Sequence, residues 1–460
     1  MQILHYSLGL PPFRRGGLVK YCDDLMIAEK KLHHGVSLLY PGALHDKSSK
    51  VKILAKGKTV IDDVTIDSTY ELDNALPVPL MDGVNDFSAF MVKKDVHVFD
   101  IFFDEHHFDV LHLHTFMGLP GEVLASARRH GIRIVYTSHD YFAICTRDLL
   151  FRNGHPCNDD HECHDCTSCN ASALSFRKMQ FLQSSLYKRL KDNVLIKILR
   201  QRHNRNIYNV NSVDTEENII DADHDLCGLY QKLRRQNMNL LNHIDAVHFN
   251  SSVTFDVYRR YGKTKSNSHV ITITNGSIQD HRKHVSVSSR LELGYLGPGD
   301  LHKGFLLLME ACDMLWKEGF HNFRLHLYLN GVADKPYAVN HGMYQYSDLE
   351  KVMSEFQLLV VPSLCYETFG MTMIEARSYG IPAIVSTHAG AKDLIIENVN
   401  GNTFIPESRV LQNLLEKIIK NPSIVEGYSQ CICSNDCIKT MEQHTKEILD
   451  LYEQVGKNQK

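Results

Sequence analysis

The chain has 460 residues, enough for two domains with separate hydrophobic cores. Charged residues make up 23% and hydrophobic residues 43%, which are ordinary proportions for a globular protein. The net charge of -4 argues against a nucleic-acid-binding protein, because such proteins present a basic surface to phosphates.

The N-terminus and the cysteines indicate the compartment. Residues 1–8 form a strand-like run without a basic leader or a small-residue cleavage site, so we expect no signal peptide. No stretch approaches the roughly 20 apolar residues that a membrane-spanning helix needs. Twelve cysteines without a secretion signal are typical of a reducing compartment. We expect a soluble cytoplasmic protein, free or at the inner face of the membrane.

Short apolar runs alternate with helical patterns along the first part of the chain. Such runs, buried on both faces and separated by helices, indicate a parallel sheet, whereas residues 50–80 have the pattern of a β-rich hairpin. From Ser138 to about Asn239 a Cys/His/Asp-rich loop and a basic helical stretch interrupt the alternation. The expected strands are Ile3–Ser7, Val36–Tyr40, Val110–His114, Ile132–Thr137, Asp245–Asn250 and Val270–Thr274, and the expected helices are Leu18–Leu32 and Gly121–His130.

A second set of strands and helices begins at Leu291. Val285–Ser289 precedes it, alternates valine with serine and has the composition of a linker. Two α/β domains that meet at a cleft are the consistent interpretation. The expected strands are Leu291–Leu296, Arg324–Leu329, Leu358–Val361 and Ala383–Ser386, and the expected helices are Leu306–Lys317, Met371–Tyr379, Val410–Ile419 and Thr440–Val455.

Residues 358–376 form the most informative segment, in which an apolar strand is followed by a polar loop and a helix. Ligands of open parallel sheets bind beyond the carboxyl ends of the strands, where helix N-termini present free amides. We therefore expect a diphosphate at this helix N-terminus. The amides expected to bind it are those around Phe369, Gly370, Met371 and Thr372.

Two glutamates flank this helix N-terminus. Glu367 precedes the helix and is placed to face a neutral sugar hydroxyl. Glu375 lies about one and a half turns into the helix, where ribose hydroxyls could donate to it. Two carboxylates would repel a phosphate unless they bind hydroxyls, so they favour a ligand with a sugar at each end. The alternative is an acidic helix N-terminus stabilised by the helix dipole, which Glu375 alone would favour and the whole block does not.

Residues 367–376 resemble the retaining family-4 glycosyltransferases of the GT-B fold. Their pattern, Glu-x-Phe-Gly…Glu-Ala with seven residues between the glutamates, is matched without a gap. The resemblance spans nearly the whole chain apart from an insert at 145–240. It implies two Rossmann-like domains across a cleft: 1–282 for the acceptor, 283–440 for the donor nucleotide. A C-terminal helix in 441–460 could cross back to the first domain.

Two N-terminal motifs follow the family order. Gly16 and Gly17 come after the first strand, where glycine lets the backbone approach a phosphate, although such a pair is more often only a turn. His139 follows the strand Ile132–Thr137, where it can meet a ligand, although one of 27 histidines is more often structural. The resemblance implies that the glycines cover the donor diphosphate. It places His139 beside the reacting sugar carbon.

Lys303 stands in a strand, glycine loop and helix start at residues 294–304. A lysine there would stabilise a departing diphosphate as a point charge; the alternative is a surface lysine. The family usually has an arginine after the glycine that aligns with Gly297, and Pro298 stands at that position. The cationic clamp of the family is therefore incomplete. The candidates to compensate are Arg14, Arg15 and His302.

The resemblance also implies the reaction. A sugar is transferred with retention of anomeric configuration, and the leaving phosphate takes the acceptor proton, so catalysis rests on positioning and charge stabilisation. No catalytic cofactor or metal is expected. His139 and Glu367 would orient the sugar while Lys303 stabilises the leaving group. The expected donor is a nucleotide sugar, UDP-linked rather than GDP-linked, and the acceptor is a glycan or lipid-linked molecule of cell-surface polysaccharide synthesis.

The insert begins with a cysteine cluster that could chelate structural zinc and so knot a polar loop. The spacing C-x5-C-x2-C-x2-C matches no standard zinc finger, and free thiols or a redox pair are the alternative. Similar cysteine-bearing inserts occur in some bacterial members of the family. The cysteines are Cys157, Cys163, Cys166 and Cys169, with Cys145 upstream and His155, His161 and His164 nearby.

A basic segment follows at residues 172–205, with nine Lys or Arg against one acidic residue, Asp192. Its apolar residues recur at helical spacing, which predicts an amphipathic helix or helix pair. Such a face can lie on an anionic membrane; the alternative is a solvated face over a small core.

Two other functional classes compete with a glycosyltransferase. A nucleotide-dependent oxidoreductase would rest on the glycines at 294, 297 and 299, whose order is wrong for a dinucleotide-binding fingerprint. A GT-B-fold partner subunit without catalytic activity would rest on Pro298 alone. The joint presence of Glu367, Glu375, Lys303 and His139 argues against that alternative.

Overall fold

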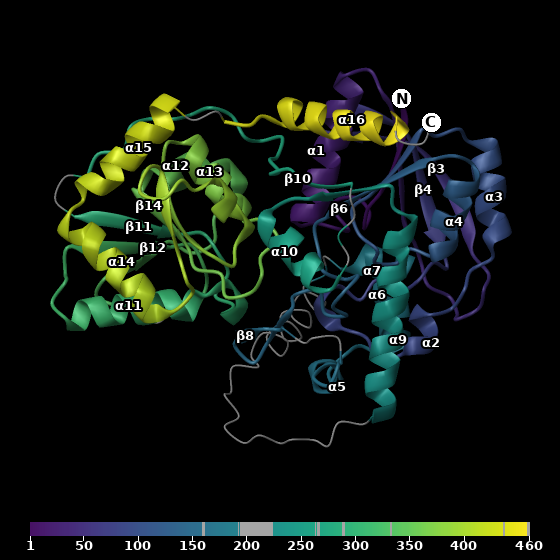
Figure 1. Ribbon diagram of the computed structural model, residues 1–460, viewed down its shortest axis with the longest axis horizontal. Coiled ribbons are helices and arrows are strands. Elements are labelled where there is room, and N and C mark those ends of the chain that lie inside the picture. Colours follow the sequence, from purple (N-terminus) through teal and green to yellow (C-terminus); the bar gives the residue numbers. More distant parts are fainter. Residues whose placement is uncertain are drawn as a thin grey trace.

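The computed structural model describes residues 1–158, 162–191, 193, 224–262, 264, 267–287, 290–331, 334–435 and 438–457. His161, Asp192, residues 194–205 of the basic segment and residues 288–289 of the expected linker lie outside this part of the chain. Two sheet-centred lobes lie side by side in Figure 1. No helix among the described residues is long and apolar enough to cross a membrane.

The N-terminal lobe is built on an eight-stranded sheet of order β10-β9-β6-β5-β1-β2-β4-β3. Neighbouring strands are parallel except for β3 and β4, which form an antiparallel hairpin at the edge. The strands of this sheet are β1 (Gln2–Tyr6), β2 (Gly35–Pro41), β3 (Lys52–Ile61), β4 (Val64–Asp73), β5 (Val110–Leu113), β6 (Arg133–Ser138), β9 (Ala246–Phe249) and β10 (Ser268–Val270).

Helices cover both faces of this sheet, so its strands are apolar on both sides. Leu4 of β1 belongs to the hydrophobic cluster with α3 and α4, whereas Ile3 belongs to the cluster with α1 and α16. This alternation follows from successive side chains of a strand pointing to opposite faces. The helices of the lobe are α1 (Gly17–Lys31), α2 (Phe87–Phe90), α3 (Val96–Glu105), α4 (Gly121–Arg129), α9 (His224–Leu240) and α10 (Ser252–Arg260), with 3₁₀ turns η1 (Leu80–Asp82) and η2 (Leu241–His243).

The C-terminal lobe has an all-parallel sheet of six strands, in the order β13-β12-β11-β14-β15-β16. Leu358 and Val360 of β14 pack with α11 and α14, and the alternate residues Leu359 and Val361 pack with α12 and α13. Its strands are β11 (Leu291–Tyr295), β12 (Phe323–Leu327), β13 (Ala338–Asn340), β14 (Leu358–Val361), β15 (Ala383–Ser386) and β16 (Gly401–Phe404). Its helices are α11 (Phe305–Lys317), α12 (Leu349–Ser354), α13 (Met371–Ser378), α14 (Ser408–Lys420) and α15 (Ser423–Asn435), with 3₁₀ turns η3 (Leu301–Lys303), η4 (Tyr346–Asp348) and η5 (Gly390–Leu394).

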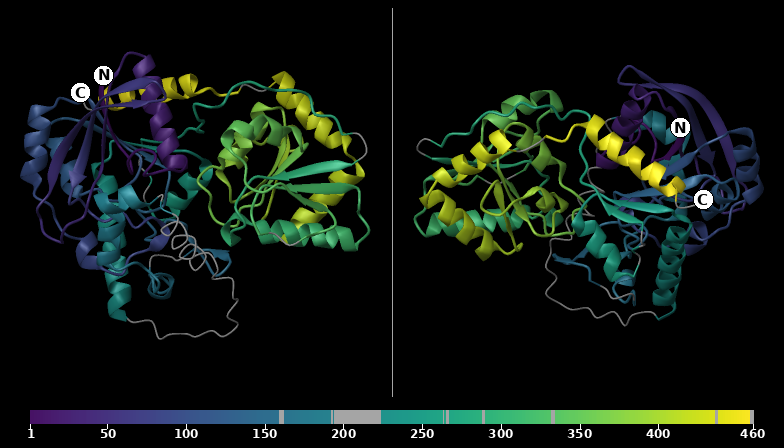
Figure 2. Two further views of the ribbon diagram at one scale, coloured as in Figure 1. Left: turned by 180° about the vertical axis from the view of Figure 1, so that it is seen from behind. Right: turned by 45° about the horizontal axis from the view of Figure 1, so that its top comes forward.

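The last helix, α16 (Met441–Lys457), leaves the C-terminal lobe and packs on the N-terminal one, as both views of Figure 2 show. Its apolar face contacts α1 and β6. Ile448, Leu451 and Val455 are buried there. The chain therefore passes between the lobes twice, once before β11 and once before α16.

The insert after β6 carries short elements: β7 (Phe151–Arg152), β8 (His155–Pro156), α5 (Cys166–Cys169), α6 (Phe176–Gln183) and α7 (Ser185–Leu190). Two expectations need correction. The strand expected at Val270–Thr274 ends at Val270, and the carbonyl of Ile271 instead accepts a hydrogen bond from the ring of His248. Helix α15 was not expected, because its serines, glycine and cysteines have low helix propensity.

Candidate active site

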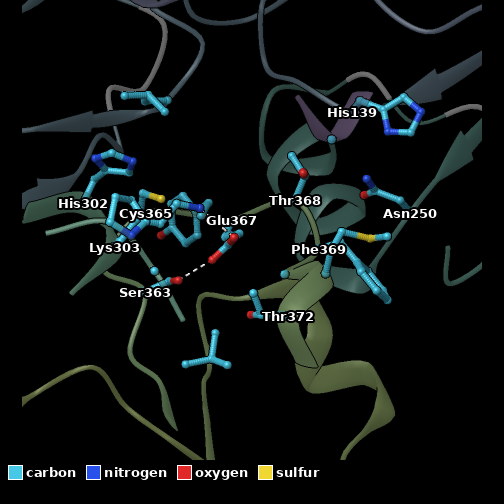
Figure 3. Close-up of a pocket in the computed structure, with 18 of the residues that line it drawn as sticks. His139, Asn250, His302, Lys303, Ser363, Cys365, Glu367, Thr368, Phe369 and Thr372 are labelled. Carbon is cyan, nitrogen blue, oxygen red and sulfur yellow. Dashed lines mark hydrogen bonds and ion pairs between the residues drawn. The ribbon is translucent and has the colours of Figure 1, made fainter. Parts of the chain in front are cut away.

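A cavity of about 440 Å³ lies between the lobes (Figure 3). It opens at the carboxyl ends of β6, β9, β11 and β14, which is where open parallel sheets bind ligands. The N-terminal lobe contributes Gly17, Leu18, His139, Asp140, Tyr141, Asp148, Leu149, Asn250 and Ile273. The C-terminal lobe contributes Tyr295, Leu296, Gly297, Pro298, His302, Lys303, residues 360–363 and residues 365–372.

The N-terminus of α13 forms one wall of this cavity. Gly370 is its N-cap residue, with φ of 108°, a conformation that favours glycine. No side chain of the described residues caps the helix, and its first turn contains no acidic residue. The amides of Met371 and Thr372 are therefore left for another acceptor. The alternative of an acidic helix N-terminus does not apply, because Glu375 lies beyond the first turn.

Lys303 and Glu367 form an ion pair on the cavity wall. Lys303 Nζ lies 2.6 Å from Glu367 Oε1, and their side chains are 28% and 18% exposed. The hydroxyl of Ser363 donates to the other oxygen of Glu367. Burial raises the pKa of the carboxyl, but Lys303 and Ser363 outweigh burial and lower it. Burial likewise opposes the charge of Lys303, yet Glu367 keeps its pKa raised. Both groups are therefore charged at neutral pH.

A close approach of two loops brings these residues together. Gly304 has φ of 74°, and a Cβ atom there would lie 1.8 Å from the carbonyl oxygen of Pro362. The carbonyl of His302 accepts hydrogen bonds from the amides of Leu364 and Cys365, at 3.0 and 3.1 Å. The loop after β11 is thus fastened to the end of β14, so Lys303 faces Glu367.

The Glu367 loop is also held by its backbone, including one contact from the other lobe. The amide of Glu367 donates to the carbonyl of His388 at 3.0 Å, and the carbonyl of Glu367 accepts from Gly390 at 2.9 Å. Ser251, the N-cap residue of α10, donates to the carbonyl of Thr368 at 2.7 Å. The N-terminal lobe therefore contacts the loop next to the α13 amides.

His139 enters the cavity from the N-terminal lobe. Its ring centroid lies 4.5 Å from that of Tyr21 and 5.5 Å from that of His114. Burial, with a further contribution from His444, lowers the pKa of His139 to about 3. His139 is therefore neutral at physiological pH and can offer one donor and one acceptor nitrogen.

The cavity brings together most of the expected site residues: Gly17, His139, Lys303, Glu367, Phe369, Gly370, Met371 and Thr372. Gly16 and Glu375 are not among its lining residues. Glu375 is 8% exposed on α13, and burial raises its pKa to about 7. Burial, with a further contribution from the charge of Glu375, raises the pKa values of Tyr344 and Tyr346 to about 12. The ribose role of Glu375 stays a prediction.

Pro298, which stands where the resembling family usually has an arginine, supplies no second cation to the cavity. Its carbonyl accepts a hydrogen bond from the hydroxyl of Tyr295 at 2.7 Å. Of the three residues considered as substitutes for arginine, Arg14 and Arg15 do not line the cavity and His302 does. Burial lowers the pKa of His302 to about 4, so it is neutral at pH 7. Lys303 is the cation that the described lining residues supply.

The cysteines expected to bind zinc are buried or half-buried. Among the described residues, none of these cysteines belongs to a group of three or more potential ligands whose ligand atoms lie within 4.8 Å of one another. Burial raises the pKa of Cys145 to about 12, with contributions from Cys169 and Cys166, so these thiols are close neighbours. Zinc binding by Cys157, Cys163, Cys166 and Cys169 stays a prediction.

Several lining residues could not be found from sequence patterns. Asp148 lies in the insert, has φ of 68° and accepts a hydrogen bond from the amide of Tyr141 at 2.7 Å. Asn250 follows β9, and only its place at a strand end could have suggested it. Tyr366 and Cys365 stand within residues 358–376, but tyrosine and cysteine have no fixed chemical role at these positions of the motif.

Comparison with known protein families identifies a domain within the chain. Residues 277–432 match the model of the family described as Glycosyl transferases group 1. This segment contains β11 to β16 and the cavity residues Lys303, Glu367 and Gly370. The C-terminal lobe therefore carries a glycosyl transferases group 1 domain.

Similar proteins support the same fold. Sucrose synthase 1 of Hordeum vulgare is 36% identical over 70 residues, which are 14% of this chain and only 9% of that protein. Sucrose-phosphate synthase from Thermosynechococcus elongatus aligns over 100% of both chains, with a TM-score of 0.57 and 14% identity. Anabaena Alr3699/HepE, solved in complex with UDP, aligns over 100% of this chain and 99% of its own, with a TM-score of 0.53 and 14% identity. The fold is GT-B.

Proposed function

We propose that this chain is a retaining glycosyltransferase that moves a sugar from a nucleotide-diphosphate sugar to a glycan or lipid-linked acceptor. The observation that carries the proposal is the pairing of free α13 amides with the Lys303 cation in one interlobe cavity. Amides at a helix N-terminus and a lysine are the usual partners of a diphosphate. A UDP-linked donor is supported by the UDP complex of the Anabaena relative.

Both lobes contribute residues to the reaction. The bond between the anomeric carbon and the diphosphate breaks, and the electron pair leaves with the diphosphate, whose charge Lys303 and the amides of Met371 and Thr372 stabilise. The acceptor oxygen attacks from the same face, and its proton passes to a leaving phosphate oxygen. His139 and Glu367 bind hydroxyls of the sugar. No residue is needed as a base, and no metal is needed for this step.

A donor screen tests the proposal. UDP-, GDP- and ADP-sugars and NAD are titrated against the full chain in a thermal-shift assay, followed by transfer to lipid-linked acceptors. A nucleotide sugar should raise the melting temperature and be turned over with retention. Stabilisation by NAD alone would favour an oxidoreductase. Binding of no donor would favour the partner subunit without catalytic activity, for which Pro298 is the supporting residue.

We also infer that helices α6 and α7 lie on an anionic membrane and so place the acceptor domain near lipid-linked substrates. Their large apolar side chains are exposed: Phe181 by 44%, Leu186 by 57% and Leu190 by 39%. Arg177, Lys178 and Arg189 lie exposed in the same two helices. Apolar residues beside basic ones are typical of helices at a membrane interface.

Vesicle co-sedimentation tests this surface. The protein should sediment with phosphatidylglycerol-containing vesicles more than with phosphatidylcholine vesicles, and Leu186→Glu should weaken the binding. Leu306→Glu is the control, because Leu306 is 48% exposed on α11 of the other lobe. Equal sedimentation of the wild-type protein with both vesicle types would contradict the inference.

A further inference from the structure

Histidines gather under the cavity, in the N-terminal lobe. His5, His112, His114 and His248 are each 0% exposed. His5 is in β1, His112 in β5 and His248 in β9, and His114 is the residue after β5. All four lie on the sheet face that α1 and α16 cover. Such burial requires hydrogen-bond partners for the ring nitrogens. One chain of these partners leads directly to His139.

This chain of hydrogen bonds begins at the buried carboxylate of Glu29 on α1. His5 Nε2 lies 2.6 Å from Glu29 Oε2, and His5 Nδ1 lies 3.0 Å from His114 Nε2. His114 Nδ1 then lies 3.4 Å from His139 Nε2. Both nitrogens of His5 and of His114 are therefore used. Among the described residues, no hydrogen bond reaches Nδ1 of His139.

The carboxylate sets the direction of the whole chain. A carboxylate only accepts hydrogen bonds, so a neutral His5 ring carries its one proton on Nε2, facing Glu29. The Nδ1 of His5 then accepts a hydrogen bond from the Nε2–H of His114. The Nδ1 of His114 in turn accepts a hydrogen bond from the Nε2–H of His139. Each neutral imidazole has one proton, and the hydrogen bond at one nitrogen decides the state of the other. Burial keeps His114 and His139 neutral, because it lowers their pKa values far below the usual range.

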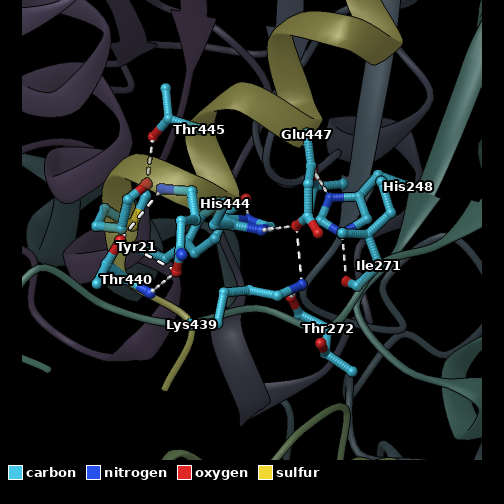
Figure 4. A network of polar contacts seen from close by, with 12 residues as sticks. Tyr21, His248, Ile271, Thr272, Lys439, Thr440, His444, Thr445 and Glu447 are labelled. Carbon is cyan, nitrogen blue, oxygen red and sulfur yellow. Dashed lines mark hydrogen bonds and ion pairs between the residues drawn. The ribbon is translucent and has the colours of Figure 1, made fainter. Parts of the chain in front are cut away.

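The C-terminal helix fixes the other side of the same assembly. The hydroxyl of Tyr452 on α16 donates to Glu29 Oε1 at 3.1 Å, so both carboxylate oxygens are occupied. Tyr21, whose ring packs against His139, has its hydroxyl 2.7 Å from Nε2 of His444 (Figure 4). The Nδ1 of His444 lies 3.3 Å from Glu447, which also pairs with Lys439. The His139 ring is thus held between His114 and a tyrosine that α16 immobilises.

We propose that Glu29, His5 and His114 are positioning residues that hold His139 as the Nε2-protonated tautomer, so that His139 Nδ1 is the acceptor presented to a hydroxyl of the donor sugar. This inference rests on the proposed function for the identity of the ligand. The tautomer of His139 does not depend on that ligand, because the hydrogen bonds that set it are present in the ligand-free protein. It makes the buried histidines part of the site, although none of the three lines the cavity.

A metal ion is the competing explanation for part of the chain. Ligand atoms of His5, Cys22 and His114 lie within 4.8 Å of one another. In the structure, however, His5 Nδ1 and His114 Nε2 contact each other directly at 3.0 Å. Metal content compared between the wild-type protein and His114→Phe therefore distinguishes a hydrogen-bonded chain from a metal site, because metal held by the cysteines of the insert would remain in the variant.

The direct test is long-range nitrogen–proton NMR of histidine-labelled full-length protein without ligand, with the His139 signal assigned by loss in His139→Gln. We expect a proton on Nε2 and none on Nδ1. His114→Phe keeps a ring beside His139 but removes the acceptor, and it should mix the tautomers. His114→Gln keeps a carbonyl acceptor and an amide donor, and it should restore the wild-type signal. A proton on Nδ1 in the wild-type protein, or bound metal in fresh wild-type protein that is lost in His114→Phe, would overturn the proposal.

Kinetics provide a second readout with a matched control. His114→Phe should lower the transfer rate about tenfold, the effect of losing one active-site hydrogen bond, while His114→Gln recovers most of the rate. His326→Phe is the control, because His326 is buried between Glu292 and His341 in a similar chain in the other lobe. It should change the rate little. Equal losses in Phe and Gln variants at 114 would contradict positioning. If no donor is turned over at all, the proposed function fails while the tautomer measurement still decides this inference.

Discussion

Lys303 was predicted from its place between a glycine loop and a helix, but its partner was not. The structure shows it bound to Glu367, so the residue expected to meet the sugar also holds the residue expected to meet the phosphate. A buried charge needs such a partner. The ion pair keeps Lys303 oriented toward the cavity before any donor arrives, which is the preorganisation that electrostatic stabilisation requires.

Lys303→Met should abolish most of this stabilisation. We expect the transfer rate to fall by about 100-fold or more, as for loss of one oxyanion-stabilising group. The variant also leaves Glu367 unpaired, which should lower the free energy of unfolding by about 1–3 kcal/mol, less than for a fully buried pair because both side chains are partly exposed. Lys335→Met, which removes a pair with Asp313 whose side chains are both 32% exposed, is the control and should leave the rate unchanged.

Glu375 should make donor binding depend on pH. Its pKa in the folded chain is about 7, above the ordinary 4.5, because burial disfavours the charge. Donor affinity should fall as the pH falls from about 8 to about 6, because a protonated carboxyl accepts ribose hydroxyls poorly. Glu375→Gln should flatten this dependence. Isothermal titration of the best donor at several pH values measures it, and identical profiles for both proteins would exclude the ribose role.

The same raised pKa has the opposite effect on the ligand-free protein. The folded chain binds this proton more tightly than the unfolded chain, so the contribution of Glu375 to stability is present below about pH 4.5 and is lost as the pH rises to about 7. Glu375→Gln should therefore raise the melting temperature at pH 8 relative to the wild-type protein. At pH 5 the difference should nearly vanish. The same difference in melting temperature at both pH values would contradict a buried Glu375 carboxyl with a raised pKa.

At the scale of elements, glycine conformations build the site. The turn before α11 and the N-cap residue of α13 both have positive φ, at Gly304 and Gly370. Strand ends alone would place these segments near one another, but the close contact with Pro362 sets the position of Lys303. Sequence periodicity predicted both helices to within a residue or two. It could not predict this approach, because the approach depends on which atoms of the neighbouring loop lie nearby.

Substitution of two positive-φ glycines separates conformational strain from steric contact. Gly319→Ala, after α11, should cost about 1 kcal/mol, since no atom lies within 4 Å of its Cβ position. Gly304→Ala adds a contact at 1.8 Å with the Pro362 carbonyl, so it should cost at least about 2 kcal/mol more and weaken donor binding. Urea unfolding and donor titration measure both effects. Equal stability losses would show that the loop adapts freely.

The two-lobed architecture was predicted because alternating strands and helices with a parallel-sheet pattern occur twice along the chain. The insert was predicted as an interruption, but its contacts depend on side chains from distant segments. The buried histidine chain was not predicted either. His5 stands opposite His112 in the paired strands β1 and β5, and His114 is the residue after β5. Only this strand pairing brings His5 and His114 into line with His139. The sequence spacing of these residues contains no such information.

At the scale of the whole molecule, α16 ties the C-terminal end of the chain to the first lobe. Leu451 is 2% exposed between α16, α1 and the sheet. Leu451→Ala should lower the free energy of unfolding by about 2–5 kcal/mol, because it leaves a cavity. Leu306→Ala, at a position of α11 that is 48% exposed, should change it by less than about 0.5 kcal/mol. Similar losses in both variants, measured by urea unfolding, would show that α16 does not pack as described.

The most direct measurement is the position of the diphosphate in a crystal structure of the full chain with UDP, or with whichever nucleoside diphosphate binds best in the donor screen. We expect phosphate oxygens within hydrogen-bond distance of the Met371 and Thr372 amides and of Lys303 Nζ. A nucleotide bound outside the interlobe cavity, or one whose phosphates point away from α13 and Lys303, would contradict it.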